Sequence, residues 1–458
     1  MPRKKAIPKA KYGHVKPSKQ GAENAKGSVS IRKKAHAGFK SVRGMRDILP
    51  LDQPYWDGVA HLCRKVAEDY GFRPIDTPVI EQENLFKRSI GDVTDIIQKE
   101  LFSFEDQGGE RLALRPEFTA SICRAYSERG MLNLPQPVKV YEYGTVYRHD
   151  RPQSGRYREF RQMDIETIGS DDSVTDAEII IVCWVILKTL GIDVTIQMNS
   201  MGSVESRVEY KKILIDYYKR RKSDLCEECV NRMRKNPLRL LDCKEKECSE
   251  LAKDAPPIID HLDEDSKDHF MKVLEYLDEF DLPYMLNHSI VRGLDYYTKT
   301  TFEFWYGGEE KGKLVALGGG GRYDGLIETI GGRPTPSCGA ALGIDRIVAR
   351  IREGNPQSPQ TKKFDVYLAQ LGMLARKRAL VLFEELRTKG FSVAQNFSKD
   401  GLRAQFELAD KAGVKYTLVL GQKEIVDGTI LLRDMESGMQ ETLNIQKVDK
   451  ELRKRLDK

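Results

Sequence analysis

The sequence predicts an α+β protein in which β-hairpins and helices form one part and an α/β domain forms another. Two β-favouring segments flank a turn that contains Pro, Ser and Gly between Tyr143 and Gly169, which is typical of a long hairpin. Residues 203–284 are highly charged with helical periodicity, which indicates a mostly helical insertion. Residues 364–458 alternate strand and helix patterns, which indicates a separate α/β domain. A length of 458 residues fits about two to four domains.

Composition indicates a globular protein with a polar surface, since 40% of the residues are hydrophobic and 31% are charged. No apolar run approaches the roughly 18 to 20 residues that a membrane-spanning helix needs, so no membrane partner is expected. The basic N-terminal residues lead into no apolar stretch, which argues against a secretory signal. Eight cysteines are too few and too unevenly placed for a disulfide scaffold of this length, so the sequence favours a reducing cytoplasm.

Positive charge is concentrated at the N-terminus. Residues 1–40 contain twelve Lys or Arg and one acidic residue, a net charge of +11, whereas the other 418 residues carry −5. Because this segment has few large apolar residues, we expect a basic disordered extension. Two roles stay open for it: a solubilising tail, or an arm that binds nucleic acid by neutralising phosphates.

The first folded part is predicted over residues 41–202. Apolar residues recur at helical spacing over residues 56–70. Residues 74–86 are expected to be extended, with two prolines that limit them to a sheet edge or an interface. A hairpin with a Gly-Gly turn is predicted over residues 102–115.

The second half of the chain resumes the same alternation. A helix is expected over residues 176–191, and the helical insertion of residues 203–284 follows it. Strand patterns return in residues 285–352 and complete the first domain. A polar linker that contains proline is predicted over residues 353–363, ahead of the α/β domain of residues 364–458.

The long hairpin carries the residues best suited to binding phosphate. Its arginines present planar forks of donors that match phosphate oxygens, Phe160 is available for stacking, and acidic residues lie beside them. The alternatives are a nucleotide-phosphate site and a solvated, charged hairpin. The arginines are Arg148, Arg151, Arg156, Arg158 and Arg161, and the acids are Glu159, Asp164 and Glu166.

Two glycine-rich segments approach nucleotide-binding motifs without matching them. Residues 307–313 have the spacing of a phosphate loop, but Leu314 stands where that motif needs Ser or Thr. The run of residues 318–321 lacks the dinucleotide fingerprint, because Tyr323 takes the place of the third glycine. Four glycines in a strand pattern indicate close approach of a ligand or of another backbone, and the polar residues nearby favour a ligand over a flexible bulge.

Three isolated residues are further candidates. Arg292 precedes a glycine, an aspartate and two tyrosines, which suits a pocket, although tyrosines on strands usually serve packing. Arg346 opens a helix, where a surface salt bridge is the commoner use. Glu117 lies between a strand and a helix, where it equally suits a helix cap.

Half of the eight cysteines lie within one short span of the insertion. Cys226, Cys229, Cys243 and Cys248 form a C-x2-C pair and a C-x4-C pair, separated by thirteen residues. Four thiolates suit a closed tetrahedral zinc site, although the second pair is looser than the usual spacing. The alternatives are a structural Zn²⁺ and reduced thiols.

Together these motifs resemble those of histidyl-tRNA synthetase, a family of class II aminoacyl-tRNA synthetases. The resemblance runs from about Val42 to the C-terminal region and includes Pro78 as the proline of the dimer interface. The matching stretches are residues 44–50 and 69–82 (the opening and motif 1), 142–162 (motif 2), 339–347 (motif 3), 114–120 and 291–304 (two histidine-specific segments) and 318–326.

The resemblance implies the class II fold: an antiparallel sheet of six or more strands flanked by helices, a helical insertion that clasps tRNA, and a C-terminal anticodon-binding domain. It implies an ATP-dependent histidine–tRNA ligase. Such an enzyme activates L-histidine with ATP and Mg²⁺ to histidyl-adenylate and pyrophosphate, then transfers histidine to the 3′ end of its tRNA. A homodimer is also implied.

The resemblance also implies roles for individual residues. Arg292 lies at the reacting carboxylate and α-phosphate, and Arg148 holds the α-phosphate of ATP. The other residues implied in ATP binding are Asp150, Arg156, Phe160 (stacked on adenine) and Arg346. The residues implied in histidine binding are Glu117, Phe118 and Thr119, Gln162 and Glu166, and Tyr296, Tyr297 and Tyr323, together with Arg292.

The sequence departs from the family's usual motifs at Phe118, where glycine is common, and at Asp150 and Asp345, where glutamate is common. The sequence leaves two alternative functions. A regulatory paralogue that controls histidine biosynthesis usually lacks the anticodon-binding domain and has eroded motifs, whereas this chain retains the domain and the motifs. A non-enzymatic RNA-binding module leaves the histidine-specific segments unexplained.

Overall fold

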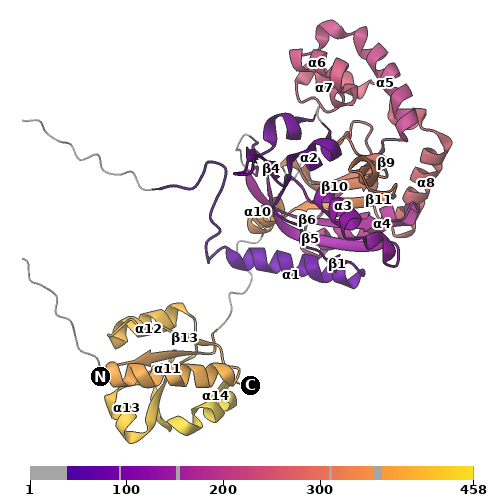
Figure 1. Ribbon diagram of the computed structural model, residues 1–458. Helices are drawn as coiled ribbons and strands as arrows, with labels where there is room; N and C mark the ends of the chain where they lie inside the picture. The colour runs from indigo at the N-terminus through magenta and orange to yellow at the C-terminus, as the bar shows by residue number, and fades with distance from the viewer. Residues whose placement is uncertain (1–38, 92–93, 151–154, 309–311, 355–363, 457–458) are drawn as a thin grey trace, which may run out of the picture. The chain divides into compact units, whose positions relative to one another are not determined.

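A computed structural model describes residues 39–91, 94–150, 155–308, 312–354 and 364–456. The chain separates into two units, residues 1–41 and 42–458, and the second contains every helix and strand given below (Figure 1). Most of the expected basic extension and of the expected linker lies outside the described residues. No described helix is long and apolar enough to cross a membrane.

An eight-stranded sheet organises the first large domain, in the order β1-β5-β6-β11-β10-β9-β7-β8. Its inner pairs are antiparallel, whereas the outermost pairs, β1 with β5 and β7 with β8, are parallel. β5 and β6 form the long hairpin that the sequence predicts. The strands are β1 (Arg73–Pro74), β5 (Val138–Tyr147), β6 (Glu159–Ile168), β7 (Thr195–Ser200), β8 (Tyr284–Leu286), β9 (Thr298–Gly308), β10 (Gly312–Arg322) and β11 (Ser337–Gly343).

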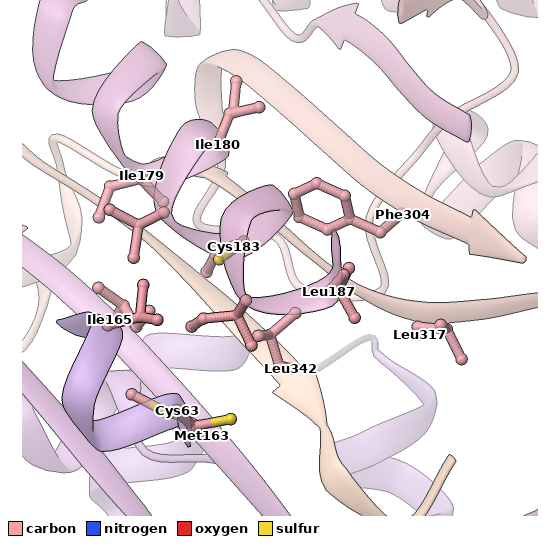
Figure 2. Close-up of a cluster of buried hydrophobic side chains, with 14 of the residues drawn as sticks. Cys63, Met163, Ile165, Ile179, Ile180, Cys183, Leu187, Phe304, Leu317 and Leu342 are labelled. Carbon is pink, nitrogen blue, oxygen red and sulfur yellow. The ribbon is translucent and has the colours of Figure 1, made fainter. Parts of the chain in front are cut away.

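One face of this sheet is apolar and buried under helices. Because side chains alternate along a strand, Met163 of β6 shares this face with Leu342 of β11 and Phe304 of β9. Figure 2 shows these residues together with Cys183 and Leu187 from α4. The helices that contribute to this core are α1 (Gln53–Asp69), α4 (Ser173–Thr189), α8 (Glu264–Glu279) and α10 (Ile344–Gly354).

The opposite face carries polar side chains above a floor of small residues. Gln162, Asp164 and Glu166 of β6 lie opposite Gly343, Ala341 and Gly339 of β11. The glycine run of β10 continues this floor. An added Cβ at Gly319 would lie 2.5 Å from the Phe302 carbonyl oxygen and 2.8 Å from Arg292 Nη1. Glycine is therefore required in this run because the neighbouring backbone and Arg292 approach it closely. The sequence predicts close approach of a ligand or of another backbone at these glycines.

A small three-stranded sheet, in the order β2-β4-β3, precedes α3, and Arg115, which follows β4, contacts the end of β5. Its β3–β4 hairpin is the predicted Gly-Gly hairpin. The backbone N–H of Tyr147, at the end of β5, donates to the Arg115 carbonyl oxygen at 3.0 Å. The elements are β2 (Ile80–Gln82), β3 (Ser103–Glu105), β4 (Arg111–Leu114), α2 (Glu83–Ile90), α3 (Thr119–Glu128) and α9 (Leu326–Thr329).

The expectation that residues 74–86 are extended is wrong for their last part. Residues from Glu83 onward form α2. Phe86 and Ile90, one helical turn apart, are fully buried in the same cluster, and Lys87 Nζ pairs with Glu83 at 2.8 Å. Tertiary burial of one helical face therefore outweighs the extended pattern set by the preceding prolines.

Helices dominate the insertion. Ser203 caps α5 by accepting from the Ser206 N–H at 3.1 Å, and Asp263 caps α8 at 2.8 Å. Helix α8 packs against α4 in the core of the main sheet, whereas α5 to α7 contribute to a second apolar cluster. The further helices are α5 (Val204–Lys219), α6 (Glu227–Lys235), η4 (Pro237–Leu240) and α7 (Lys246–Lys253).

The C-terminal domain is a five-stranded sheet in the order β13-β12-β14-β15-β16. β12 is parallel to β13 and β14, and the last two pairs are antiparallel. Its core is built from the faces of α11 and α14 that meet the sheet. The elements are β12 (Val366–Gln370), α11 (Met373–Thr388), β13 (Val393–Gln395), α12 (Leu402–Lys411), β14 (Tyr416–Leu420), α13 (Gln422–Asp427), β15 (Thr429–Asp434), β16 (Gln440–Asn444) and α14 (Val448–Leu456).

Candidate active site

Strand β6 supplies one row of the candidate site. Phe160, Gln162, Asp164 and Glu166 occupy alternate positions and therefore share one face of the sheet. The last three are buried. Arg161, one of the arginines of the hairpin, faces the other way, and its guanidinium lies 5.0 Å from the Trp56 ring centroid.

Two hydroxyl groups hold Glu166. Thr119 Oγ1 donates to Glu166 Oε1 at 2.7 Å, and the Tyr323 hydroxyl donates to Oε2. Gly339 leaves room for this carboxyl, because an added Cβ there would overlap it. Burial raises the pKa of Glu166 to about 8, against the lowering effect of the two hydroxyl groups. A cationic ligand beside this carboxyl favours its ionised form.

Around Glu166, the buried oxygen atoms Glu117 Oε2, Gln162 Oε1 and Asp164 Oδ1 have no hydrogen-bond partner within the described part of the chain. Glu117 Oε1 accepts from the Ala120 N–H at 2.9 Å, so the carboxyl caps α3 with one oxygen and leaves the other unpaired. Burial raises the pKa of Glu117, and burial with the charges of nearby carboxylates raises that of Asp164. Buried acceptors without donors are unfavourable, which indicates a ligand rich in donors.

Arg292 and three tyrosines adjoin these acceptors. Arg292 Nη1 lies 2.5 Å from Glu303 Oε1, and the guanidinium is 5.5 Å from the Tyr297 ring centroid. The Tyr296 ring centroid is 4.7 Å from that of Tyr297 and 5.6 Å from that of Tyr323. The tyrosines thus connect a buried cation to the acidic group.

Further arginines gather near the turn of the hairpin. Arg148 lies 5.5 Å from the Phe160 ring centroid. Burial, with the nearby positive charges of Arg156 and Arg148, lowers the pKa of Arg346. Arg156 Nη1 lies 2.9 Å from Asp150 Oδ2. Three clustered guanidinium groups suit a polyanion, so the site is acidic at one end and basic at the other.

Like Asp150, which pairs with Arg156, the other two departures from the usual motifs have partners within the fold. The Phe118 ring is fully buried, with the Arg115 guanidinium 4.4 Å from its centroid, and Arg115 pairs with Glu142 at 2.6 Å. Asp345 accepts from the Arg161 N–H at 2.6 Å and pairs with Arg46 at 2.6 Å. Both side chains therefore serve packing or ion pairing.

Beside the two glycine-rich segments, Tyr323 is the residue whose side chain reaches the candidate site. Arg322 is fully buried and pairs with Asp176 and Asp324, so it serves the fold, whereas Tyr323 reaches Glu166. Residues 309–311 of the phosphate-loop candidate lie outside the described residues, and those on either side of them belong to β9 and β10.

The four cysteines of the insertion come together. The sulfur atoms of Cys226, Cys229, Cys243 and Cys248 all lie within 4.8 Å of one another, and Cys226 Sγ is 4.0 Å from Cys243 Sγ. Backbone N–H groups point at two of the sulfur atoms, at 3.3 and 3.4 Å. Zinc bonds to sulfur at about 2.3 Å, which places neighbouring sulfur atoms of a tetrahedron about 3.8 Å apart. The donor set and its spacing fit a closed Zn²⁺ site.

Sequence reasoning assigns no role to Asp164 or Glu303. Asp164 has a usable signal, because it lies between Gln162 and Glu166 at the same strand period. Glu303 has no such signal in the sequence. It lies eleven residues after Arg292, and the two side chains meet because of the path that the chain takes into β9.

A largely antiparallel sheet, with arginines at a hairpin turn and polar side chains above a floor of small residues, is the architecture of a class II aminoacyl-tRNA synthetase. The chain matches the family model of histidyl-tRNA synthetase over residues 44–347 and that of the anticodon binding domain over residues 365–455. It is 42% identical over 419 residues to histidine–tRNA ligase of Dehalococcoides mccartyi, covering 91% of this chain and 100% of that one. It is 40% identical over 404 residues to histidine–tRNA ligase of Acetivibrio thermocellus, covering 88% and 96%.

The apo histidyl-tRNA synthetase of S. aureus has the same fold, with a TM-score of 0.75 and 30% identity over 91% of this chain and 100% of that chain. The chain therefore belongs to the histidyl-tRNA synthetase family. The predicted family, the fold class and the enzyme class, an ATP-dependent ligase, are confirmed.

Proposed function

We propose that this chain activates L-histidine with ATP and transfers it to the 3′ end of its tRNA, through the site described above. The observation that supports histidine most directly is the set of unpaired buried acceptors on Glu117, Gln162 and Asp164. Histidine offers an ammonium group and an imidazole N–H to such acceptors, and a carboxylate to the arginines at the other end. The charge polarity of the site matches that of the amino acid.

The histidine pocket combines fixed acceptors with aromatic walls. Glu117 and Thr119 take the α-ammonium group, and Gln162 and Glu166 complete the pocket. The hydrogen bond from Thr119 to Glu166 supports this arrangement by fixing the carboxyl. Buried polar groups reject apolar analogues strongly, because such analogues leave them unpaired. The residues around the imidazole are Tyr296, Tyr297 and Tyr323, with Phe118 behind the pocket wall.

ATP lies along the hairpin in this proposal. Adenine stacks on Phe160, the α-phosphate meets Arg148, and the outer phosphates meet Arg156 and Arg346. ATP arrives with Mg²⁺, which neutralises its phosphates. The carboxylates paired with these arginines and with Arg292 are Asp150 and Glu303, and carboxylate oxygens are ligands that Mg²⁺ prefers.

Activation proceeds by displacement at phosphorus. A carboxylate oxygen of histidine attacks the α-phosphorus, the bond to the bridging oxygen breaks, and pyrophosphate leaves. Arg292 and Arg148 stabilise the charge that develops on the α-phosphoryl oxygens, so no protein nucleophile is needed. A ribose hydroxyl of tRNA then attacks the histidyl carbonyl carbon, and AMP leaves.

The domain division follows the same function. Residues 41–202 and 285–352 form the catalytic core, and the insertion, residues 203–284, meets the acceptor arm of tRNA. Residues 364–458 bind the anticodon, which the family match over residues 365–455 supports.

Zinc is proposed as a structural ion of the insertion. The convergence of four sulfur atoms, from the N-cap of α6, from α6, from the segment before α7 and from α7, supports this assignment. When bound, the ion holds these segments together and supplies no chemistry to the reaction.

A homodimer and a cytoplasmic location complete the proposal. Val79 and Ile80, next to the motif 1 proline Pro78, leave 39% and 46% of their surface exposed, which supports a protein contact there. All eight cysteines are free of disulfides, which supports a reducing compartment.

Charging of tRNA tests the proposal. Purified protein is incubated with labelled histidine, ATP and tRNA, and acid-precipitable label is counted with and without ATP. We expect label on the tRNA that decodes histidine and none on a tRNA with another anticodon and acceptor stem. Absence of charging on every tRNA by a folded protein would contradict the proposed transfer step.

A further inference from the structure

A cavity of about 200 Å³ lies between helix α5 of the insertion and the segment that carries Arg292. Its charged lining consists of Arg207 and Lys211 from α5, with Arg292 and Asp295 from that segment. Most of the remaining wall is apolar. The lining therefore carries a net positive charge and joins the insertion to the candidate active site.

Arg207 and Lys211, the two cations of α5 that line the cavity, form no salt bridge with a described carboxylate. Arg207 Nη1 donates to the Tyr297 carbonyl oxygen at 2.5 Å, yet within the described ranges no carboxylate forms a salt bridge with Arg207 or Lys211. Asp295, the acidic residue of the lining, accepts instead from Asn236 at 2.9 Å. Burial lowers the pKa of both cations, the charge of Arg207 adds to the effect on Lys211, and the single negative charge of Asp295 offsets only part of it. Two partly buried cations that share one carboxylate and form no salt bridge with it favour an anion from outside the chain.

We propose that this cavity binds a phosphodiester of the single-stranded 3′ end of tRNA, with Arg207 and Lys211 as its ligands. The inference rests on the proposed function, since the terminal ribose must reach the activated histidine beside Arg292. The cavity shares Arg292 with that centre, so a phosphate one nucleotide away from the reacting ribose falls within it. Apolar walls suit the sugar and base that accompany such a phosphate.

The phosphodiester proposed here differs from a phosphate of ATP in its ligands, which belong to the insertion. The outer phosphates of ATP are assigned to arginines of the hairpin and of α10, and the α-phosphate to Arg148 and Arg292, whereas Arg207 and Lys211 belong to α5. Substitution of Lys211 is therefore expected to affect transfer to tRNA and to leave activation of histidine unchanged.

Lys211→Ala, compared with Lys212→Ala, tests the inference. Lys212 is the neighbour on α5, is 64% exposed and pairs with Glu209 at 2.7 Å, so it reports the effect of losing a lysine outside the cavity. For Lys211→Ala, we expect kcat/KM for tRNA to fall about tenfold, with ATP–pyrophosphate exchange within about twofold of the parent. The slope of log(kcat/KM) for tRNA against log salt should weaken by about 0.7, the value for one contact to single-stranded phosphate. Lys212→Ala should show neither change.

A second measurement uses an RNA acceptor hairpin with and without its single-stranded 3′ nucleotides. Removing these nucleotides should weaken binding to the parent protein more than binding to Lys211→Ala. Equal losses in both proteins, or an unchanged salt slope, would overturn the inference. A parallel loss of pyrophosphate exchange in Lys211→Ala would assign the anion to ATP and also overturn it. Failure of the parent protein to activate histidine would instead refute the proposed function, and the hairpin binding would still report on the cavity.

Discussion

We expect Gly339→Ala to displace Glu166 and so to weaken histidine activation selectively. An added Cβ at residue 339 would overlap the Glu166 carboxyl, so the carboxyl must turn away. Glu166 then loses the hydrogen bonds from Thr119 and Tyr323. At about 1.5 kcal/mol for each bond, the loss is about 3 kcal/mol, or roughly 100-fold in kcat/KM for histidine.

The assay is ATP–pyrophosphate exchange at varied histidine and varied ATP. The KM for ATP should change by less than about threefold, because the arginines assigned to ATP do not contact Gly339. Gly325→Ala is the matched control, since an added Cβ at that glycine has nothing within 4 Å and its φ is −86°. Thermal unfolding of each variant establishes that the measured protein is folded.

Glu166→Gln separates the carboxyl from the added volume. The Gly339 Cβ would also lie 2.8 Å from the Ile165 carbonyl oxygen, so Gly339→Ala can lose stability for a second reason. Glu166→Gln keeps the size of the side chain and changes its charge. Retention of kcat/KM for histidine within about threefold in both folded variants would refute the assignment of Glu166 to the pocket.

Three further outcomes are expected. Arg292→Ala should leave the protein folded and lower adenylate formation by at least about 10²-fold, since a cation at the reacting centre is lost; near-normal pyrophosphate exchange would contradict this role. Burial raises the pKa of Glu166 to about 8, and a bound cation favours the ionised carboxyl. The value of kcat/KM for histidine should therefore rise from pH 6.5 to 8.5, and Glu166→Gln should remove the part of this rise that Glu166 causes. Elemental analysis should find about one zinc per chain in the parent protein and less in Cys248→Ser, which should also unfold at lower temperature; a zinc-free parent whose folding resists chelators would rule out the metal.

Local signals account for much of the fold. The long hairpin was predictable because β-favouring flanks enclose a turn, and β5 and β6 pair across that turn. Helix α2 was not, because two nearby prolines suggested an extended segment and only burial of Phe86 and Ile90 favours the helix. The packing of α8 against α4 likewise depends on tertiary contacts that charge pattern does not reveal.

The candidate site was predictable mainly through motifs. Alternation along β6 groups Gln162 with Glu166, and this pattern is legible in the sequence. The need for glycine at residue 339 cannot be predicted from the sequence, because it depends on the register between β6 and β11. The partners of Phe118 and Asp345 come from distant parts of the chain, so their packing also required the structure.

The most direct measurement is ATP–pyrophosphate exchange with each of the twenty amino acids in turn. The site predicts exchange with histidine alone, because its buried acceptors need a ligand with both an ammonium group and an imidazole. Exchange with no amino acid, in a folded protein, would contradict the account and favour a regulatory paralogue of the same fold.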